Sequence, residues 1–195
     1  DRRQRQMCIR DSIVLSGENQ MTAFAAGPGI LVNQGATLTI QGSSDAALTV
    51  YGAKQDEMYD GGDASAALAC GYAGIGGPNH SYDGPFDYTG TIRIESGIIN
   101  AYGFDYGAGI GGGDYSSGGN IEILGGQVTA INAPVDINDW TSKSASGIGG
   151  SQGMHSGKIA ISGDTTVVNA QGSYACAGIG CLLYTSDAAD DLTRV

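Results

Sequence analysis

The chain has 195 residues, 34 of them glycine, and a formal net charge of −11 at pH 7. Nucleic acids and anionic membranes bind to clustered Lys and Arg, and nine basic residues against twenty acidic ones argue against both partners. No apolar run approaches the roughly 20 residues of a membrane helix, and glycine lacks the three-residue period of collagen.

The two ends, residues 1–12 and 181–195, share nothing with the sequence between them. Residues 6–11 (Gln-Met-Cys-Ile-Arg-Asp) and 181–186 (Cys-Leu-Leu-Tyr-Thr-Ser) resemble a transposon-type sequencing adapter translated from each strand. We therefore interpret both ends as assembly scars rather than as a natural basic start and acidic tail. We expect neither to add a coil, although either can pair with an open edge strand. Residues 13–180 are then a fragment of a larger protein.

The first repeat-like unit spans residues 29–50. It contains the short apolar or alternating peptides 29–32 (Gly-Ile-Leu-Val), 38–40 (Leu-Thr-Ile) and 48–50 (Leu-Thr-Val). Alternation over three to five residues, bounded by Gly, Asn, Asp and Ser, indicates short strands. We expect residues 13–32 to supply the tail of a preceding coil and a first ladder strand.

The peptide Ala/Ser-Gly-Ile-Gly occurs four times, at residues 73–76, 108–111, 146–149 and 177–180. Its isoleucines are 35, 38 and 31 residues apart, a period typical of solenoids, propellers and other repeat arrays. Each interval contains two alternating triplets that are separated by a Gly or Ser-Gly turn. These triplets are residues 92–94 and 99–101, 121–123 and 128–130, and 159–161 and 168–170.

Three short strands per repeat predict an all-β fold, a right-handed parallel β-helix of about four to five coils. Coils of this kind stack about 4.8 Å apart, so equivalent residues form ladders. We expect one inward ladder of Ile75, Ile110, Ile148 and Ile179. The glycines of the motif should then point outward, either because they permit tight backbone bends or because they form a flat face for a partner or a flanking loop.

Loops of unequal length, residues 53–70, 77–90 and 132–145, separate the predicted strands. The first is acidic, and it provides a candidate Ca²⁺ site whose spacing matches no Ca²⁺-loop motif; solvated loop charge is the alternative. Its carboxylates are Asp56, Glu57, Asp60 and Asp63. We expect no other metal and no cofactor, and no catalytic residue.

Histidines and cysteines give little support for catalysis. His80 and His155 are isolated loop residues, which are usually solvated surface groups. Cys70 and Cys176 lie three coils apart, about 14 Å by the coil rise, beyond the reach of a disulfide. We expect both thiols to be reduced.

Aromatic side chains are concentrated in residues 72–115, mostly in turns and loops. Four of them could line one edge of the stack as sugar-stacking groups; the alternative is that they cover coil edges. These four are Tyr82, Tyr88, Tyr106 and Tyr115. An ice-binding face needs repeated Thr, whereas the predicted outward column of the first strand reads Thr39, Arg93, Glu122 and Ala160.

A family resemblance is carried by three peptides. They are residues 107–113 (Gly-Ala-Gly-Ile-Gly-Gly-Gly), 118–130 (Gly-Gly-Asn-Ile-Glu-Ile-Leu-Gly-Gly-Gln-Val-Thr-Ala) and 32–40. They resemble the Gly-rich β-helix repeats of large surface or secreted proteins of Gram-positive gut bacteria, which are labelled carbohydrate-binding or adhesin-like. The resemblance implies an extracellular or cell-wall location and an adhesive scaffold, and it brings no catalytic residues.

The sequence therefore predicts a non-enzymatic β-helix segment of a cell-surface protein, which binds polysaccharide or host glycans through its loops. Two alternatives remain open at this stage. One is a fragment of a polysaccharide lyase or glycoside hydrolase, although basic residues are too few and scattered for the lyase chemistry. The other is a spacer stalk.

Overall fold

The computed structural model describes residues 10–23, 27–53, 71–79, 89–133, 144–151, 153–173 and 176–180, and strand is the regular secondary structure that these residues form. The strands wind into a parallel β-helix of five coils with three strands in each, which confirms the predicted fold. In this described part of the chain, no helix has the length and apolarity to cross a membrane.

Sheet A is formed by the first strand of each coil, in the order β1-β4-β7-β10-β13. Sheet B follows with β2-β5-β8-β11-β14, and sheet C with β3-β6-β9-β12-β15. The bounds in sheet A are β1 Arg10–Leu15, β4 Thr37–Gly42, β7 Thr91–Ile94, β10 Asn120–Ile123 and β13 Lys158–Ile161. Those in sheet B are β2 Glu18–Thr22, β5 Ala47–Tyr51, β8 Ile98–Gly103, β11 Gln127–Asn132 and β14 Val167–Gln171. Those in sheet C are β3 Ile30–Leu31, β6 Ile75–Gly76, β9 Ile110–Gly111, β12 Ile148–Gly149 and β15 Ile179–Gly180.

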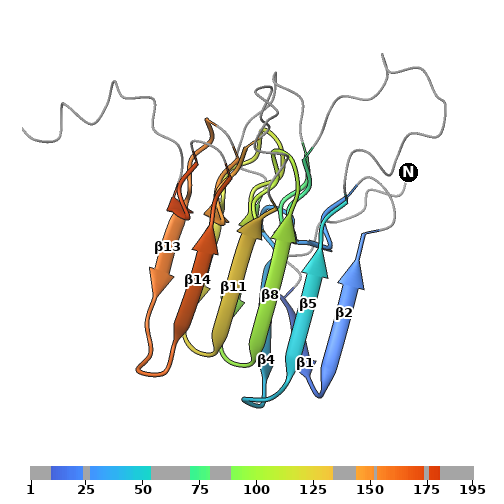
Figure 1. Ribbon diagram of the computed structural model, residues 1–195, viewed down its shortest axis with the longest axis vertical. Helices are drawn as coiled ribbons and strands as arrows, with labels where there is room; N and C mark the ends of the chain where they lie inside the picture. Colours follow the sequence, from blue (N-terminus) through green and yellow to red (C-terminus); the bar gives the residue numbers. More distant parts are fainter. Residues whose placement is uncertain are drawn as a thin grey trace, which may run out of the picture.

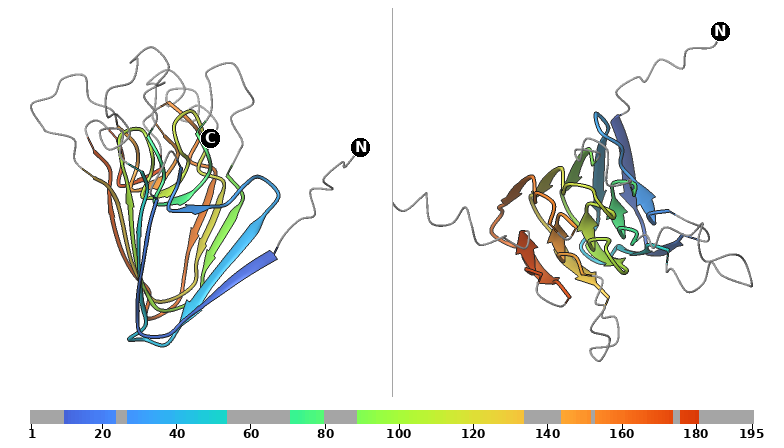
Figure 2. Two further views of the ribbon diagram at one scale, coloured as in Figure 1. Left: turned by 90° about the vertical axis from the view of Figure 1, so that its right-hand side faces the viewer. Right: turned by 90° about the horizontal axis from the view of Figure 1, so that it is seen from above.

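Sheet B lies in front in Figure 1, where β2, β5, β8, β11 and β14 run side by side. Viewed along the stack, the long sheets A and B converge at their shared turns, and the short sheet C with its loops closes the opposite side (Figure 2). The cross-section is therefore a wedge, and the core fills the space between the three sheets.

The core consists of apolar ladders in which the second, third and fourth coils contribute buried residues at the same positions. The predicted ladder of Ile75, Ile110, Ile148 and Ile179 pairs in register along sheet C. The first three have no exposed surface, whereas Ile179 is 45% exposed because it lies in the last described coil. Sheet A has the column Leu38, Ile92 and Ile121, and sheet B the column Leu48, Ile99 and Val128. Burial in both long sheets alternates strictly along each central strand, because successive side chains point to opposite faces.

The motif glycines of the central coils are buried by the chain's own backbone, so they do not form an open face for a partner. A Cβ on Gly74 would lie 2.7 Å from the carbonyl oxygen of Gly109 in the next coil. A Cβ on Gly76 would overlap the carbonyl of Gly111, and the second glycine of every copy has positive φ, from 118° to 156°. Glycine is therefore required because coils approach closely at this corner, and the tight-bend interpretation is confirmed.

The first coil starts earlier than expected. β1 begins at Arg10, three residues before the expected boundary at residue 13, and pairs with β4 from Arg10 to Leu15. Arg10, Asp11 and Ser12 are exposed, and Asp11 occupies a position where the next coil has Leu38. Residues 1–9 and 181–195, and with them most of both predicted scars, lie outside the described residues.

The isoleucine ladder makes a direct test of the core. Ile110→Asn should lower the free energy of unfolding by about 2–5 kcal/mol, because it removes buried apolar area and leaves a buried amide without partners. Glu122→Gln, on the outward side of β10, should change it by about 0.5 kcal/mol or less. Equal shifts in chemical denaturation would contradict the assignment of Ile110 to the core.

The glycine corner gives a second test, with two copies of one motif as a matched pair. Gly180→Ala should cost about 1–3 kcal/mol, the cost of an unfavourable backbone conformation, since its Cβ would meet nothing closer than Ala177 Cβ at 4.0 Å. Gly111→Ala has the same backbone cost, and its Cβ also overlaps the Gly149 carbonyl, so its loss should be larger by about 1–3 kcal/mol. Thermal melts that rank the two variants equally would show that coil contact is not the cause.

Candidate functional site

Two of the four tyrosines predicted to stack on sugars are among the described residues. Tyr106 lies in the turn between β8 and β9, and Tyr115 lies in the loop between β9 and β10; both are half-buried. Burial, followed by the nearby Asp114, Tyr115 and Asp105, raises the pKa of the Tyr106 phenol. The fold therefore brings these two tyrosines together in the third coil, whereas Tyr82 and Tyr88 lie outside the described residues.

Buried hydrogen bonds fix this corner of the third coil. Asn132, which is fully buried, donates from Nδ2 to the carbonyl oxygens of Asp105 at 3.0 Å and Gly107 at 2.7 Å. The backbone N–H of Asp114 donates to the carbonyl of Gly71 at 3.0 Å and to Asn79 Oδ1 at 3.1 Å. Tyr106 and Tyr115 thus lie in a turn and a loop that buried hydrogen bonds hold in place, and both residues are partly buried.

The other predicted site residues do not form a site in the described structure. The candidate Ca²⁺ ligands Asp56, Glu57, Asp60 and Asp63 lie outside the described residues, as do His80 and Cys70. Within the described segments, no three His, Cys, Asp or Glu residues are grouped so as to hold a metal ion. His155 is exposed, and Cys176 is a half-buried free thiol whose pKa is raised by burial.

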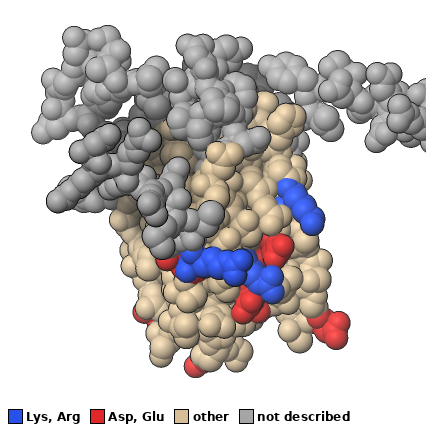
Figure 3. All heavy atoms as spheres, turned by 180° about the vertical axis from the view of Figure 1, so that it is seen from behind, with Lys and Arg blue, Asp and Glu red and all other residues tan. Residues whose placement is uncertain are grey.

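The outward side of sheet A, here called the A face, carries charge. Thr39, Arg93, Glu122 and Ala160 form one column in register, as the sequence predicted. Arg93 donates from Nε to Glu95 at 2.8 Å and from Nη1 to Glu122 at 2.9 Å. All three side chains are partly exposed, so solvent screens these ion pairs and they contribute little to stability. In Figure 3, which shows the molecule from behind, acidic and basic side chains lie next to one another across the middle of the visible face.

The outward side of sheet B, here called the B face, has a different character. Its central column contains hydroxyl and amide side chains only, and it consists of Gln20, Thr49, Asn100, Thr129 and Asn169. Two further columns flank it on β5, β8, β11 and β14. The column on one side consists of Ala47, Ile98, Gln127 and Val167, and the column on the other side consists of Tyr51, Tyr102, Ile131 and Gln171. None of these side chains is acidic or basic at pH 7, so four adjacent strands present an uncharged surface.

Two features order the side chains on the B face. The Tyr51 and Tyr102 rings stack with centroids 5.0 Å apart and an interplanar angle of 13°. Beside them, Asn100 Nδ2 donates to Thr49 Oγ1 at 3.4 Å. Because β-strands hold each residue in register with the coil below, the column repeats polar groups about every 4.8 Å.

The B face was not predicted from the sequence, although its signal was present there. The middle residues of the second triplets are Thr49, Asn100, Thr129 and Asn169, which are uncharged and polar in every coil. The outward column of the first triplets, by contrast, contains the charged residues Arg93 and Glu122. The B-face column alternates Thr with Asn and therefore still lacks the uniform Thr repeat that an ice-binding face needs.

Comparisons with protein-family models, curated proteins and solved structures give no match to this chain.

The environment of Tyr106 predicts a pH response. Its raised pKa means that the folded state favours the neutral phenol. The resulting contribution to the free energy of unfolding should be complete below the ordinary tyrosine pKa of about 10. It should be lost as the pH rises through the higher pKa that Tyr106 has in the folded state. Absorbance titration of the wild type and Tyr106→Phe should yield a difference curve with its midpoint above about 10. A midpoint at or below that value would contradict the half-buried, carboxylate-flanked placement of the phenol.

Proposed function

We propose that this chain is a non-enzymatic scaffold segment of an extracellular or cell-surface protein, and that its B face binds uncharged polysaccharide. The observation that carries the proposal is the absence of acidic and basic side chains from the outward columns of β5, β8, β11 and β14, in a chain of net charge −11. The extracellular location rests on the family resemblance of the repeats.

Uncharged polysaccharides offer closely spaced hydroxyl groups, which both donate and accept hydrogen bonds. The column of Thr49, Asn100 and Thr129 presents both donors and acceptors at the coil spacing, about 4.8 Å. β-Sheet pairing already restricts these side chains, so their ordering on binding costs little additional entropy. A polymer that lies across the strands could therefore bond to several coils at once.

The Tyr51–Tyr102 stack supplies the apolar part of such a surface. Both rings are half-buried, and each ends in a hydroxyl group that can bond to a ligand or to water. Tyrosine gives a large contact area with few rotatable bonds, so its use in a binding face costs little conformational entropy. The nearby turn with Tyr106, which follows β8 directly, could extend this aromatic edge.

Charge supports an uncharged ligand over an acidic one. The net charge of −11 repels acidic glycans such as pectin, and the described B face offers no Lys or Arg to offset that repulsion. Hydrolysis by paired carboxylates needs two Asp or Glu residues at a set separation. The described residues of the B face include one carboxylate, Glu18. The enzyme-fragment alternative therefore has less support than the binding scaffold.

A binding assay with matched variants tests the proposal. The 195-residue chain should bind to cellulose, chitin or mixed-linkage β-glucan and not to polygalacturonate. Asn100→Ala/Thr129→Ala, which removes B-face hydrogen-bonding groups, should weaken binding by about tenfold. Thr37→Ala/Thr39→Ala, the same kind of change on the A face, should leave the affinity within about twofold.

Each other result would point to one alternative. Binding that survives Asn100→Ala/Thr129→Ala would exclude the B face as the site. The release of new reducing ends or unsaturated products would favour the hydrolase or lyase fragment. An absence of binding to every neutral polymer would favour the spacer stalk.

A further inference from the structure

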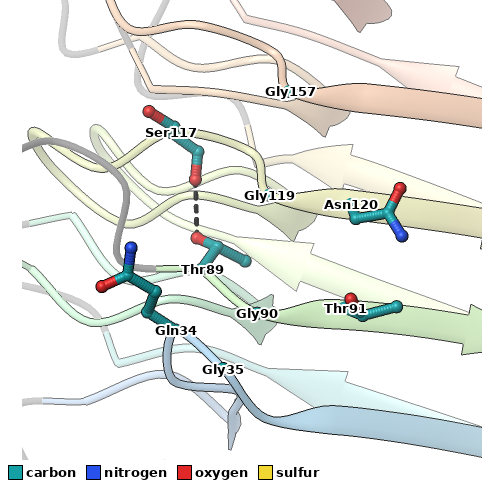
Figure 4. Close-up of a pocket in the computed structure, with 9 residues that line it drawn as sticks. All are labelled: Gln34, Gly35, Thr89, Gly90, Thr91, Ser117, Gly119, Asn120 and Gly157. Atoms are coloured by element: carbon teal, nitrogen blue, oxygen red, sulfur yellow. Dashed lines mark hydrogen bonds between the residues drawn. The ribbon is translucent and has the colours of Figure 1, made fainter.

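We infer that a groove at the corner where sheet C leads into sheet A is a separate subsite for one uncharged sugar residue. This inference rests on the proposed glycan binding and adds a second location to it. The groove has a volume of 290 Å³, near the lower end of ligand pockets, which span about 300–1,000 Å³. Its lining comes from the second to the fifth coil, so it runs along the stack (Figure 4).

The floor of the groove is made of glycines that stacking requires. A Cβ on Gly119 would lie 2.5 Å from the carbonyl oxygen of Gly90, and a Cβ on Gly157 would overlap the carbonyl of Gly119. A side chain at Gly119 or Gly157 could therefore not fill this corner without separating the coils. The hollow is a consequence of the fold, and evidence for a ligand has to come from the side chains around it.

Asn120 provides that evidence. Its Oδ1 atom is buried and has no hydrogen-bond partner, although buried polar atoms in folded proteins are nearly always paired. Asn120 lines the groove at a position where the preceding coils have Thr37 and Thr91. A turn of the half-buried Asn120 side chain toward the groove would bring Oδ1 within reach of a ligand hydroxyl group, which would donate to it and satisfy this atom.

The walls of the groove are fixed and uncharged. Thr89 Oγ1 donates to the carbonyl oxygen of Ser117 at 2.6 Å, which ties the third coil to the fourth (Figure 4). Gln34 adds an exposed amide, and Thr91 adds a hydroxyl group. None of the lining residues carries a charge, and their hydroxyl and amide groups suit a polyol; the nearby cation is Lys158, which follows Gly157 and is in register with Asn120.

Backbone pairing argues against an extended peptide as the occupant. A peptide that adds to a sheet edge needs free backbone N–H and C=O groups. Here the N–H groups of Thr91, Asn120 and Lys158 already donate to the carbonyls of Ala36, Gly90 and Gly119 in the preceding coils. The groups left for a ligand in the groove are side-chain hydroxyl and amide groups, which can form hydrogen bonds with the hydroxyl groups of a sugar.

The test uses the 195-residue chain and defined neutral hexasaccharides of cellulose, chitin, laminarin and starch type. In the wild type, the side-chain amide NMR signals of Asn120 and Gln34 should shift on titration with the hexasaccharide that binds. Asn120→Thr, which copies the residue of the two preceding coils, should weaken binding by about five- to tenfold. Thr91→Trp, which fills the groove from an outward strand position, should weaken it by about tenfold or more.

The matched control is Thr37→Asn, the reverse exchange in the same column but outside the groove lining. It should retain wild-type affinity, and a Thr37→Asn loss equal to that of Asn120→Thr would overturn the subsite. If Asn100→Ala/Thr129→Ala weakens binding while Asn120→Thr and Thr91→Trp do not, the groove inference fails and the proposed function stands. If the wild type binds no neutral hexasaccharide or polymer, the proposed function fails and the subsite with it.

Discussion

Backbone hydrogen bonding between successive coils is the constraint on which this structure depends. Each strand pairs in parallel with the equivalent strand of the next coil, so every residue is held about 4.8 Å from its counterpart. This spacing is harmless for isoleucine side chains that point into the core. It is prohibitive for any Cβ that points along the stack, as at Gly76 and Gly111, and this is why the Gly-Ile-Gly corner recurs.

The same constraint shapes the surface of the molecule. A residue that faces outward in one coil lies beside the outward residues of its neighbours, so chemical character accumulates in columns. Along sheet A the columns acquire Arg93, Glu95 and Glu122, which neutralise one another in part. Along sheet B they acquire Thr49, Asn100 and Thr129 without charge. A long, even surface of either kind needs no loop, because stacking alone provides the repetition.

The loops contribute differently, since they fix the corners between sheets. Asn132 is fully buried and satisfies two carbonyls of the preceding coil, while its Oδ1 accepts a hydrogen bond from Ser173 Oγ. Thr89 ties its coil to Ser117 in the same way. These bonds replace apolar packing where the chain turns, and they leave a polar, rigid groove beside Asn120 rather than a collapsed corner.

The sequence alone determined the coil, the order of its three strands and the inward ladders, because period-2 alternation and a repeated Gly-Ile-Gly peptide depend on local geometry and repetition. It left open whether the motif glycines form an open face for a partner, and in the structure the chain's own backbone covers them. Their burial depends on how closely the end of β8 and the next coil approach Gly74, a contact between residues far apart in the chain. The B face and the corner groove were also decided by tertiary structure. Their residues come from separate coils, and only the stacking register brings Thr49 next to Asn100, or Gly90 next to Gly119.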